Sequence, residues 1–71
     1  MIQFNEIIKD LRQKNNMSQV ELAKELDTSS QYICNIEKGG AISFERFVEI
    51  VGILGYEVEI VIKKNQLKIN F

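Results

Sequence analysis

With 71 residues, the chain is large enough for one small domain, and its 45% hydrophobic content is sufficient for that domain to fold. It shows no apolar run near the ~18 residues of a membrane-spanning helix and no signal-peptide pattern, so no membrane span is expected. A single cysteine, Cys34, excludes an internal disulfide and fits a cytoplasmic protein, and the net charge of −1 predicts weak non-specific attraction to polyanions.

The segment from Phe4 to Asn15 has the apolar periodicity of a helix. Four apolar residues recur at spacings of three, four and seven, which places them on one helical face: Phe4, Ile7, Ile8 and Leu11. Asn15 and Asn16 suit the end of this helix, because asparagine tolerates the left-handed backbone conformation.

A second helix is predicted to begin at the motif Ser18-Gln19-Val20-Glu21. This is a capping box, in which a serine caps the helix and a glutamate three residues later caps the serine in return. The residues expected to face the core are Val20, Ala23 and Leu26. Asp27 is the predicted turn residue that ends the helix.

A third, short helix is predicted at about residues 30–37, capped by Ser29 and stopped by Gly39 and Gly40. Ile33 and Ile36 are its apolar anchors. Its other side is polar or small and comprises Ser30, Gln31, Cys34 and Asn35. Two short helices joined by a short turn, the second polar on one side, are typical of a helix-turn-helix unit.

The fourth predicted helix starts at the cap Ser43 and ends at Gly55. Its apolar stripe contains Phe44, Phe47, Val48, Ile50, Val51 and Leu54. After Gly55 the apolar period changes from 3.6 to 2, which predicts one strand over 56–63, a turn at 64–66 and a second strand over 67–71.

This predicted C-terminal β-hairpin would be only marginally stable by itself. Its long apolar edge could pair with a strand of another chain. A homodimer through residues 56–71, with a shared four-stranded sheet, would satisfy both constraints and supplement a small core. The predicted organisation is a helical unit over 1–55 and a dimerisation hairpin over 56–71.

The motif elements at fixed spacing resemble those of the Cro/CI-type (XRE) helix-turn-helix family of repressors. They are Ser18-Gln19-Val20-Glu21-Leu22-Ala23, Ile33-Cys34-Asn35-Ile36-Glu37 and Gly39, and the similarity extends over about residues 4–54. The segment 54–60 is similar, over a shorter stretch, to the tail of HipB-type antitoxin regulators, in which a C-terminal strand pairs across the dimer. The resemblance implies a mostly α, four-helix, lambda-repressor-like domain followed by that strand or hairpin.

The same resemblance implies which residues contact DNA. Gln19 is expected to contact a phosphate at the start of the second helix, and Ser30, Gln31 and Asn35 to face base edges in the major groove. For these three the alternative is a merely solvated polar face. The remaining candidates, each with an equally simple structural alternative as cap, packing residue or solvated side chain, are Ser29, Tyr32, Cys34, Lys38 and Arg46.

Three further features of the sequence have structural implications. The family often pairs an arginine of the first helix with the glutamate that ends the third, and Arg12 and Glu37 stand at those positions. Asp27 stands where the family usually has glycine, so the turn is expected to form at some cost. Cys34 stands where the family often has serine. We interpret its side chain as a plain small residue and not as a redox-sensing thiol.

The function expected is that of a dimeric DNA-binding repressor that reads an inverted-repeat operator in double-stranded DNA, and not an enzyme. No catalytic, metal or cofactor motif is found, so no cofactor is expected. An antitoxin that neutralises a toxin protein and represses its own operon is the alternative. The acidic pI of about 5.3 leaves open a third, in which the helix-turn-helix serves protein contacts only.

Overall fold

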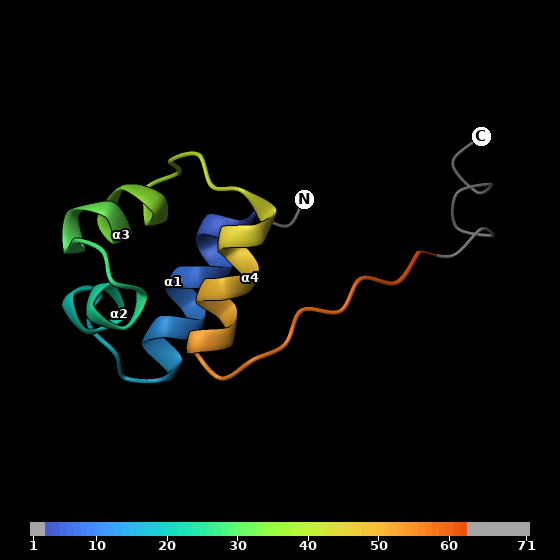
Figure 1. Ribbon diagram of the computed structural model, residues 1–71, viewed down its shortest axis with the longest axis horizontal. Helices are drawn as coiled ribbons and strands as arrows, with labels where there is room; N and C mark the ends of the chain where they lie inside the picture. The colour runs from blue at the N-terminus through green and yellow to red at the C-terminus, as the bar shows by residue number, and fades with distance from the viewer. Residues whose placement is uncertain (1–2, 63–71) are drawn as a thin grey trace.

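The computed structural model describes residues 3–62, which form four helices. These are α1 (Phe4–Lys14), α2 (Gln19–Leu26), α3 (Ser30–Glu37) and α4 (Phe44–Ile53). Helices α1 and α4 lie side by side, α2 and α3 cover one side of this pair, and the segment after α4 leaves on the opposite side (Figure 1). The four predicted helices are therefore present, with bounds within about two residues of those expected.

Serine side chains begin three of the four helices. The Oγ atoms of Ser18, Ser29 and Ser43 each accept a hydrogen bond from the backbone N–H three residues later, at 3.0–3.1 Å. At Ser18 the box is complete, because its own backbone N–H donates to the Glu21 carboxylate at 3.0 Å. Since each cap satisfies an orphan donor of the first turn, these bonds determine where each helix starts.

The core lies where all four helices meet. Its fully or nearly fully buried members are Ile8, Leu22, Ala23, Leu26, Ile33, Ile36, Phe47, Ile50, Val51 and Leu54. One expected core residue of α2 is wrong: Val20 is 52% exposed, whereas Leu22 is 0% exposed. Leu22 and Leu26, one turn apart, define the buried face together with Ala23, and Val20 points away from it.

Two non-glycine residues adopt the left-handed conformation at the turns that were predicted. Asn16 has φ of 54° between α1 and α2, and Asp27 has φ of 59° between α2 and α3. The Asp27 conformation redirects the chain from α2 to α3 in the short turn. This conformation costs free energy at both residues, because their Cβ atoms are crowded in the left-handed region, which glycine adopts freely.

The predicted strand after Gly55 is not found. Among residues 3–62 there are only helices, turns and irregular segments, and residues 57–62 run as irregular chain away from the helices (Figure 1). A strand requires a hydrogen-bonded neighbour, and none of the described residues lies beside this segment as one. The predicted turn at 64–66 and second strand at 67–71 lie outside the described residues.

Candidate nucleic-acid interface

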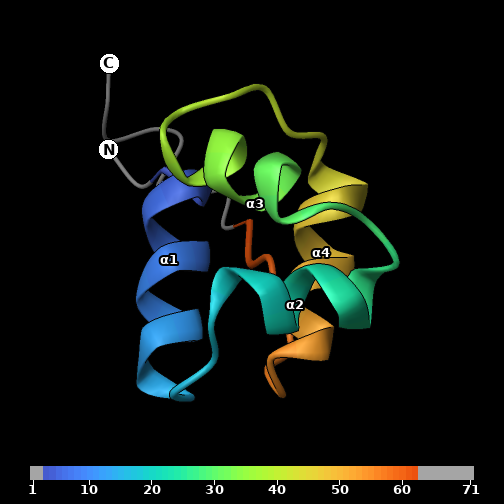
Figure 2. The ribbon, with the colours of Figure 1, turned by 90° about the vertical axis from the view of Figure 1, so that its left-hand side faces the viewer.

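Helix α3 presents a polar face on one side of the molecule. Figure 2 looks onto α2 and α3, with α1 and α4 behind them. Ile33 and Ile36, at 0% and 2% exposure, hold α3 against the core. The residues exposed on or beside the helix are Ser29, Ser30, Gln31, Asn35 and Lys38, while Tyr32 and Cys34 are half-buried.

Behind this face, a buried ion pair ties α1 to the end of α3. The Arg12 guanidinium donates to both carboxylate oxygens of Glu37, from Nε at 2.6 Å and from Nη2 at 2.9 Å, and its Nη1 donates to the Met17 carbonyl at 2.8 Å. The two side chains are only 10% and 4% exposed. The expected Arg12–Glu37 pair is therefore present, with the bidentate geometry that gives charge-assisted bonds their strength.

The electrostatics of this pair are consistent with a charged carboxylate. Burial by itself would raise the pKa of Glu37, but the hydrogen bonds from Arg12 and Gln19 and the charge of Arg12 outweigh it and hold that pKa below its ordinary value. The hydrogen bond to Glu37 raises the pKa of Arg12 in turn. Both groups are thus charged at neutral pH, and each compensates the other.

Gln19 is engaged in the same network. Its Nε2 donates to Glu37 Oε1 at 3.1 Å, so the amide that was expected to contact a phosphate is already oriented by the buried pair. Gln19 is half-buried at the first position of α2. One Nε2 hydrogen of Gln19 and the N-terminus of α2 remain to bind an anion. Gln19 thus offers fewer donors to a phosphate than an unbonded glutamine would.

Arg46 likewise makes contacts with other side chains. Its Nε donates to the Tyr32 hydroxyl at 3.2 Å, and its Nη1 pairs with Glu49 at 2.8 Å. Its guanidinium carbon also lies 5.4 Å from the centre of the Tyr32 ring. Tyr32 and Arg46 thus link α3 to α4 and help to orient α3, while their predicted contact with DNA stays a prediction.

On the outer face of α3, two of the predicted base-reading side chains contact one another. Gln31 Nε2 donates to Asn35 Oδ1 at 2.9 Å, one helical turn along. Ser30 lies beside this pair at the first position of α3, and Ser29 is committed as the helix cap. Three of the predicted DNA contacts therefore lie together, whereas Gln19 and Arg46 are held by other side chains.

Asn5 is a positioning residue that the sequence patterns did not reveal. Its Nδ2 donates to the Ile36 carbonyl at 2.6 Å and to the Gly40 carbonyl at 3.0 Å, and so it anchors the end of α3 to the start of α1. In the sequence, Asn5 is marked only as an asparagine beside the apolar stripe of α1. Such a bond between residues 31 positions apart has no local sequence signature.

Neither a metal site nor a membrane-spanning helix is found among residues 3–62. No group of three or more histidine, cysteine or acidic side chains in this range could hold a metal ion. No helix in the described range is long and apolar enough to cross a membrane.

A comparison with protein families identifies one match. The family model described as helix-turn-helix matches residues 8–61, which include all of α2, α3 and α4 and most of α1. Comparisons with curated proteins and with solved structures find no match.

Proposed function

Since the chain belongs to the helix-turn-helix family of DNA-binding transcription regulators, we propose that it is a repressor that reads a specific operator with α3 in the major groove. The observation that carries this proposal is the exposed polar face of α3, with Ser30, Gln31 and Asn35 over the buried anchors Ile33 and Ile36. Hydroxyl and amide groups on a helix of this size are suited to base edges in that groove. Occupying a promoter is sufficient for repression.

The charge of the chain determines what kind of binding to expect. The chain has nine basic and ten acidic residues, and Arg46 and Arg12 are paired with carboxylates. Because the net charge is −1 and these two arginines are paired, non-specific attraction to phosphates should be weak, and we expect sequence-dependent contacts to supply a large share of the affinity.

A gel-shift measurement with the DNA upstream of the chain's own gene tests the proposal. We expect retardation at about 50 mM salt, and a loss of affinity between about 50 and about 200 mM that is smaller than the ~10³-fold seen for proteins with six or more phosphate contacts. A random duplex of equal length is the control. No retardation at the lower salt would contradict the proposal and favour a role in protein contacts only.

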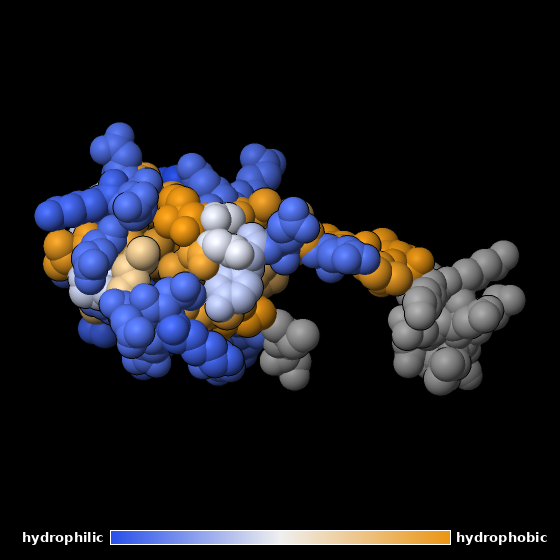
Figure 3. All heavy atoms as spheres, turned by 90° about the horizontal axis from the view of Figure 1, so that it is seen from below, coloured by the Kyte–Doolittle hydropathy of each residue, from blue (hydrophilic) through white to orange (hydrophobic). Residues whose placement is uncertain are grey.

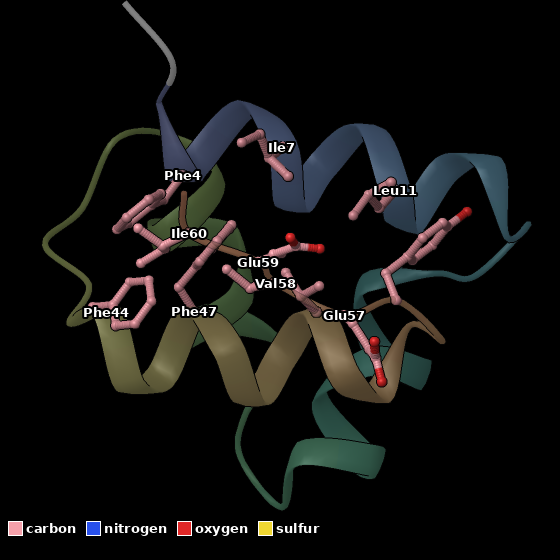
Figure 4. A pocket seen from close by; sticks show the side chains of 11 residues that line it. Phe4, Ile7, Leu11, Phe44, Phe47, Glu57, Val58, Glu59 and Ile60 are labelled. Atoms are coloured by element: carbon pink, nitrogen blue, oxygen red, sulfur yellow. The ribbon is translucent and has the colours of Figure 1, made fainter. Parts of the chain in front are cut away.

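An apolar groove supports the proposal that the protein acts as a dimer. It has a volume of about 600 Å³ and lies between the α1–α4 pair and the segment that follows α4 (Figure 4). The rings of Phe4 and Phe47, which line it, stack with centres 4.1 Å apart. The other apolar residues along it are Ile7, Leu11, Phe44, Val51, Tyr56, Val58 and Ile60.

The occupant proposed for this groove is the same segment of a second copy. Apolar surface continues from the body along the segment after α4 (Figure 3), where Ile60 and Ile62 are 62% and 78% exposed. Two copies that exchange these segments would cover both grooves and give each segment a strand partner, which it does not have among residues 3–62. The segment after α4 leaves the body on the side opposite α2 and α3 (Figure 1), so an exchange of these segments would keep both α3 helices free for half-sites about 34 Å apart.

The mass in solution, measured by light scattering, tests this dimer. We expect the mass of two chains for the wild type and of one chain for Ile60→Lys, because the substitution removes an apolar side chain from the interface and places an ammonium group among the apolar residues of the groove. Val61→Lys is the matched control, since Val61 is 59% exposed but does not line the groove. A dimeric Ile60→Lys variant would contradict this interface.

The same exposed apolar surface leaves an antitoxin role as the second candidate. A wild-type chain that is monomeric at micromolar concentration would leave the groove uncovered, and a partner protein would then be the expected occupant. Co-purification of a protein encoded beside this chain would support that role, and its binding should be lost in Ile60→Lys.

A further inference from the structure

The two amides on the outer face of α3 form one unit. Gln31 Nε2 donates to Asn35 Oδ1 at 2.9 Å, and both residues are exposed. They are four positions apart, so they are neighbours on the helix surface. Neither is held by any other side-chain hydrogen bond among the described residues, whereas Gln19 is held by Glu37.

This bond determines what each amide can still offer. Asn35 has used its oxygen as an acceptor and presents the two hydrogens of Nδ2, so toward DNA it is chiefly a donor. Gln31 has used one Nε2 hydrogen and retains its Oε1 acceptor and its second Nε2 hydrogen. In this arrangement Nε2 of Gln31 is directed to Asn35, and Oε1 and the second Nε2 hydrogen face outward for a base.

The hydrogen-bonding groups that Gln31 retains, one acceptor and one donor, match one base. Adenine presents N6–H as a donor and N7 as an acceptor in the major groove, and it accepts a bidentate contact from an amide that offers one acceptor and one donor. Guanine presents two acceptors there and cannot satisfy Gln31 Oε1. The donors of Asn35 suit a neighbouring acceptor, such as guanine O6 or N7 or thymine O4.

We propose that Asn35 is a positioning residue that orients the Gln31 amide to read adenine, so that the two residues specify a base pair jointly and not independently. This inference rests on the proposed binding of α3 in the major groove. It predicts that removing Asn35 relaxes specificity at a base that Asn35 itself does not contact.

The test uses the full chain and two substitutions of Asn35. The preferred site is first selected from a randomised duplex pool, and each base pair of a half-site is then replaced in turn. The position that Gln31 reads is the one at which discrimination disappears in Gln31→Ala. Asn35→Ala removes the acceptor for Gln31 Nε2, whereas Asn35→Asp keeps an acceptor at the same place and removes only the donors.

At the Gln31 position we expect adenine, with about 5- to 150-fold preference over the other base pairs in the wild type. Asn35→Ala should reduce this ratio to within a few-fold of unity. Asn35→Asp should retain it, although its carboxylate weakens binding to every site. Because the ratio is taken within one variant, a general loss of affinity cancels.

A second readout does not need DNA. In the free protein, NMR of the Gln31 side-chain amide should show a restricted rotamer in the wild type and in Asn35→Asp, and rotamer averaging in Asn35→Ala. Equal averaging in all three would overturn the inference, as would a non-adenine base or an unchanged ratio in Asn35→Ala. If the NMR result holds but no variant binds DNA, the proposed function fails and the adenine inference fails with it, while the amide contact itself stands.

Discussion

Replacing Arg12 with alanine is expected to lower the free energy of unfolding by about 3–5 kcal/mol, the range found when one partner of a buried ion pair is removed. The reason is the nearly complete burial of Glu37, whose side chain is only 4% exposed. Without Arg12 its carboxylate would keep one hydrogen bond, from Gln19, and would lose two. The loss of the Met17 carbonyl contact adds to this cost.

Chemical denaturation followed by circular dichroism measures this effect. Lys14→Ala is the matched control, because its ion pair with Asp10 is exposed, at 64% and 62%, and such pairs contribute about 1 kcal/mol or less. A double variant with methionine at positions 12 and 37 should recover much of the stability, since it leaves no unpaired buried charge. A loss in Arg12→Ala no larger than in Lys14→Ala would show that the pair does not stabilise the fold.

The effect of Arg12→Ala should also depend on pH in one direction. The pKa of Glu37 is lowered in the folded protein, so its contribution is fully present above the unfolded pKa, near the ordinary value of 4.5, and is lost as the pH falls through the folded pKa. The stability difference between the wild type and Arg12→Ala should therefore narrow as the pH falls below the ordinary pKa of 4.5. A difference that is constant from neutral to acidic pH would mean that charge is not its cause.

Replacing Gln31 with alanine is expected to weaken binding to the preferred operator by about 2–6 kcal/mol in a dimer, because each copy loses a bidentate base contact worth about 1–3 kcal/mol. Gln31 is exposed, and its only side-chain hydrogen bond among residues 3–62 is to Asn35, so the free energy of unfolding should change by less than about 0.5 kcal/mol. Gln31→Ala is thus predicted to weaken DNA binding without lowering stability, whereas Arg12→Ala is predicted to lower stability.

Fluorescence anisotropy with labelled operator gives the binding loss, and thermal unfolding gives the stability. Gln13→Ala is the matched control, since Gln13 is an exposed glutamine on α1 that is not among the predicted DNA contacts. Its affinity should stay within about two-fold of the wild type. A melting loss for Gln31→Ala as large as that for Arg12→Ala would contradict the separation.

The helices and their starts could be predicted because their signals are local. A serine cap bonds a backbone N–H three residues away, and an apolar stripe repeats within one helix. The left-handed turn at Asp27 is equally local. The anchors Ile33 and Ile36 and the polar outer face of α3 followed from the same periodicity, and with the family resemblance they located the face proposed to bind DNA.

The sequence by itself determined the four helices, their caps, the turn at Asp27 and the polar face of α3, because each depends on residues within about one turn of the chain. Only the tertiary structure decided which side chains are free to bind. It showed Gln19 held by Glu37, Arg46 held by Tyr32 and Glu49, and the apolar groove beside α1 and α4. Those contacts join residues far apart in the chain, and no local pattern encodes a partner that only packing brings near.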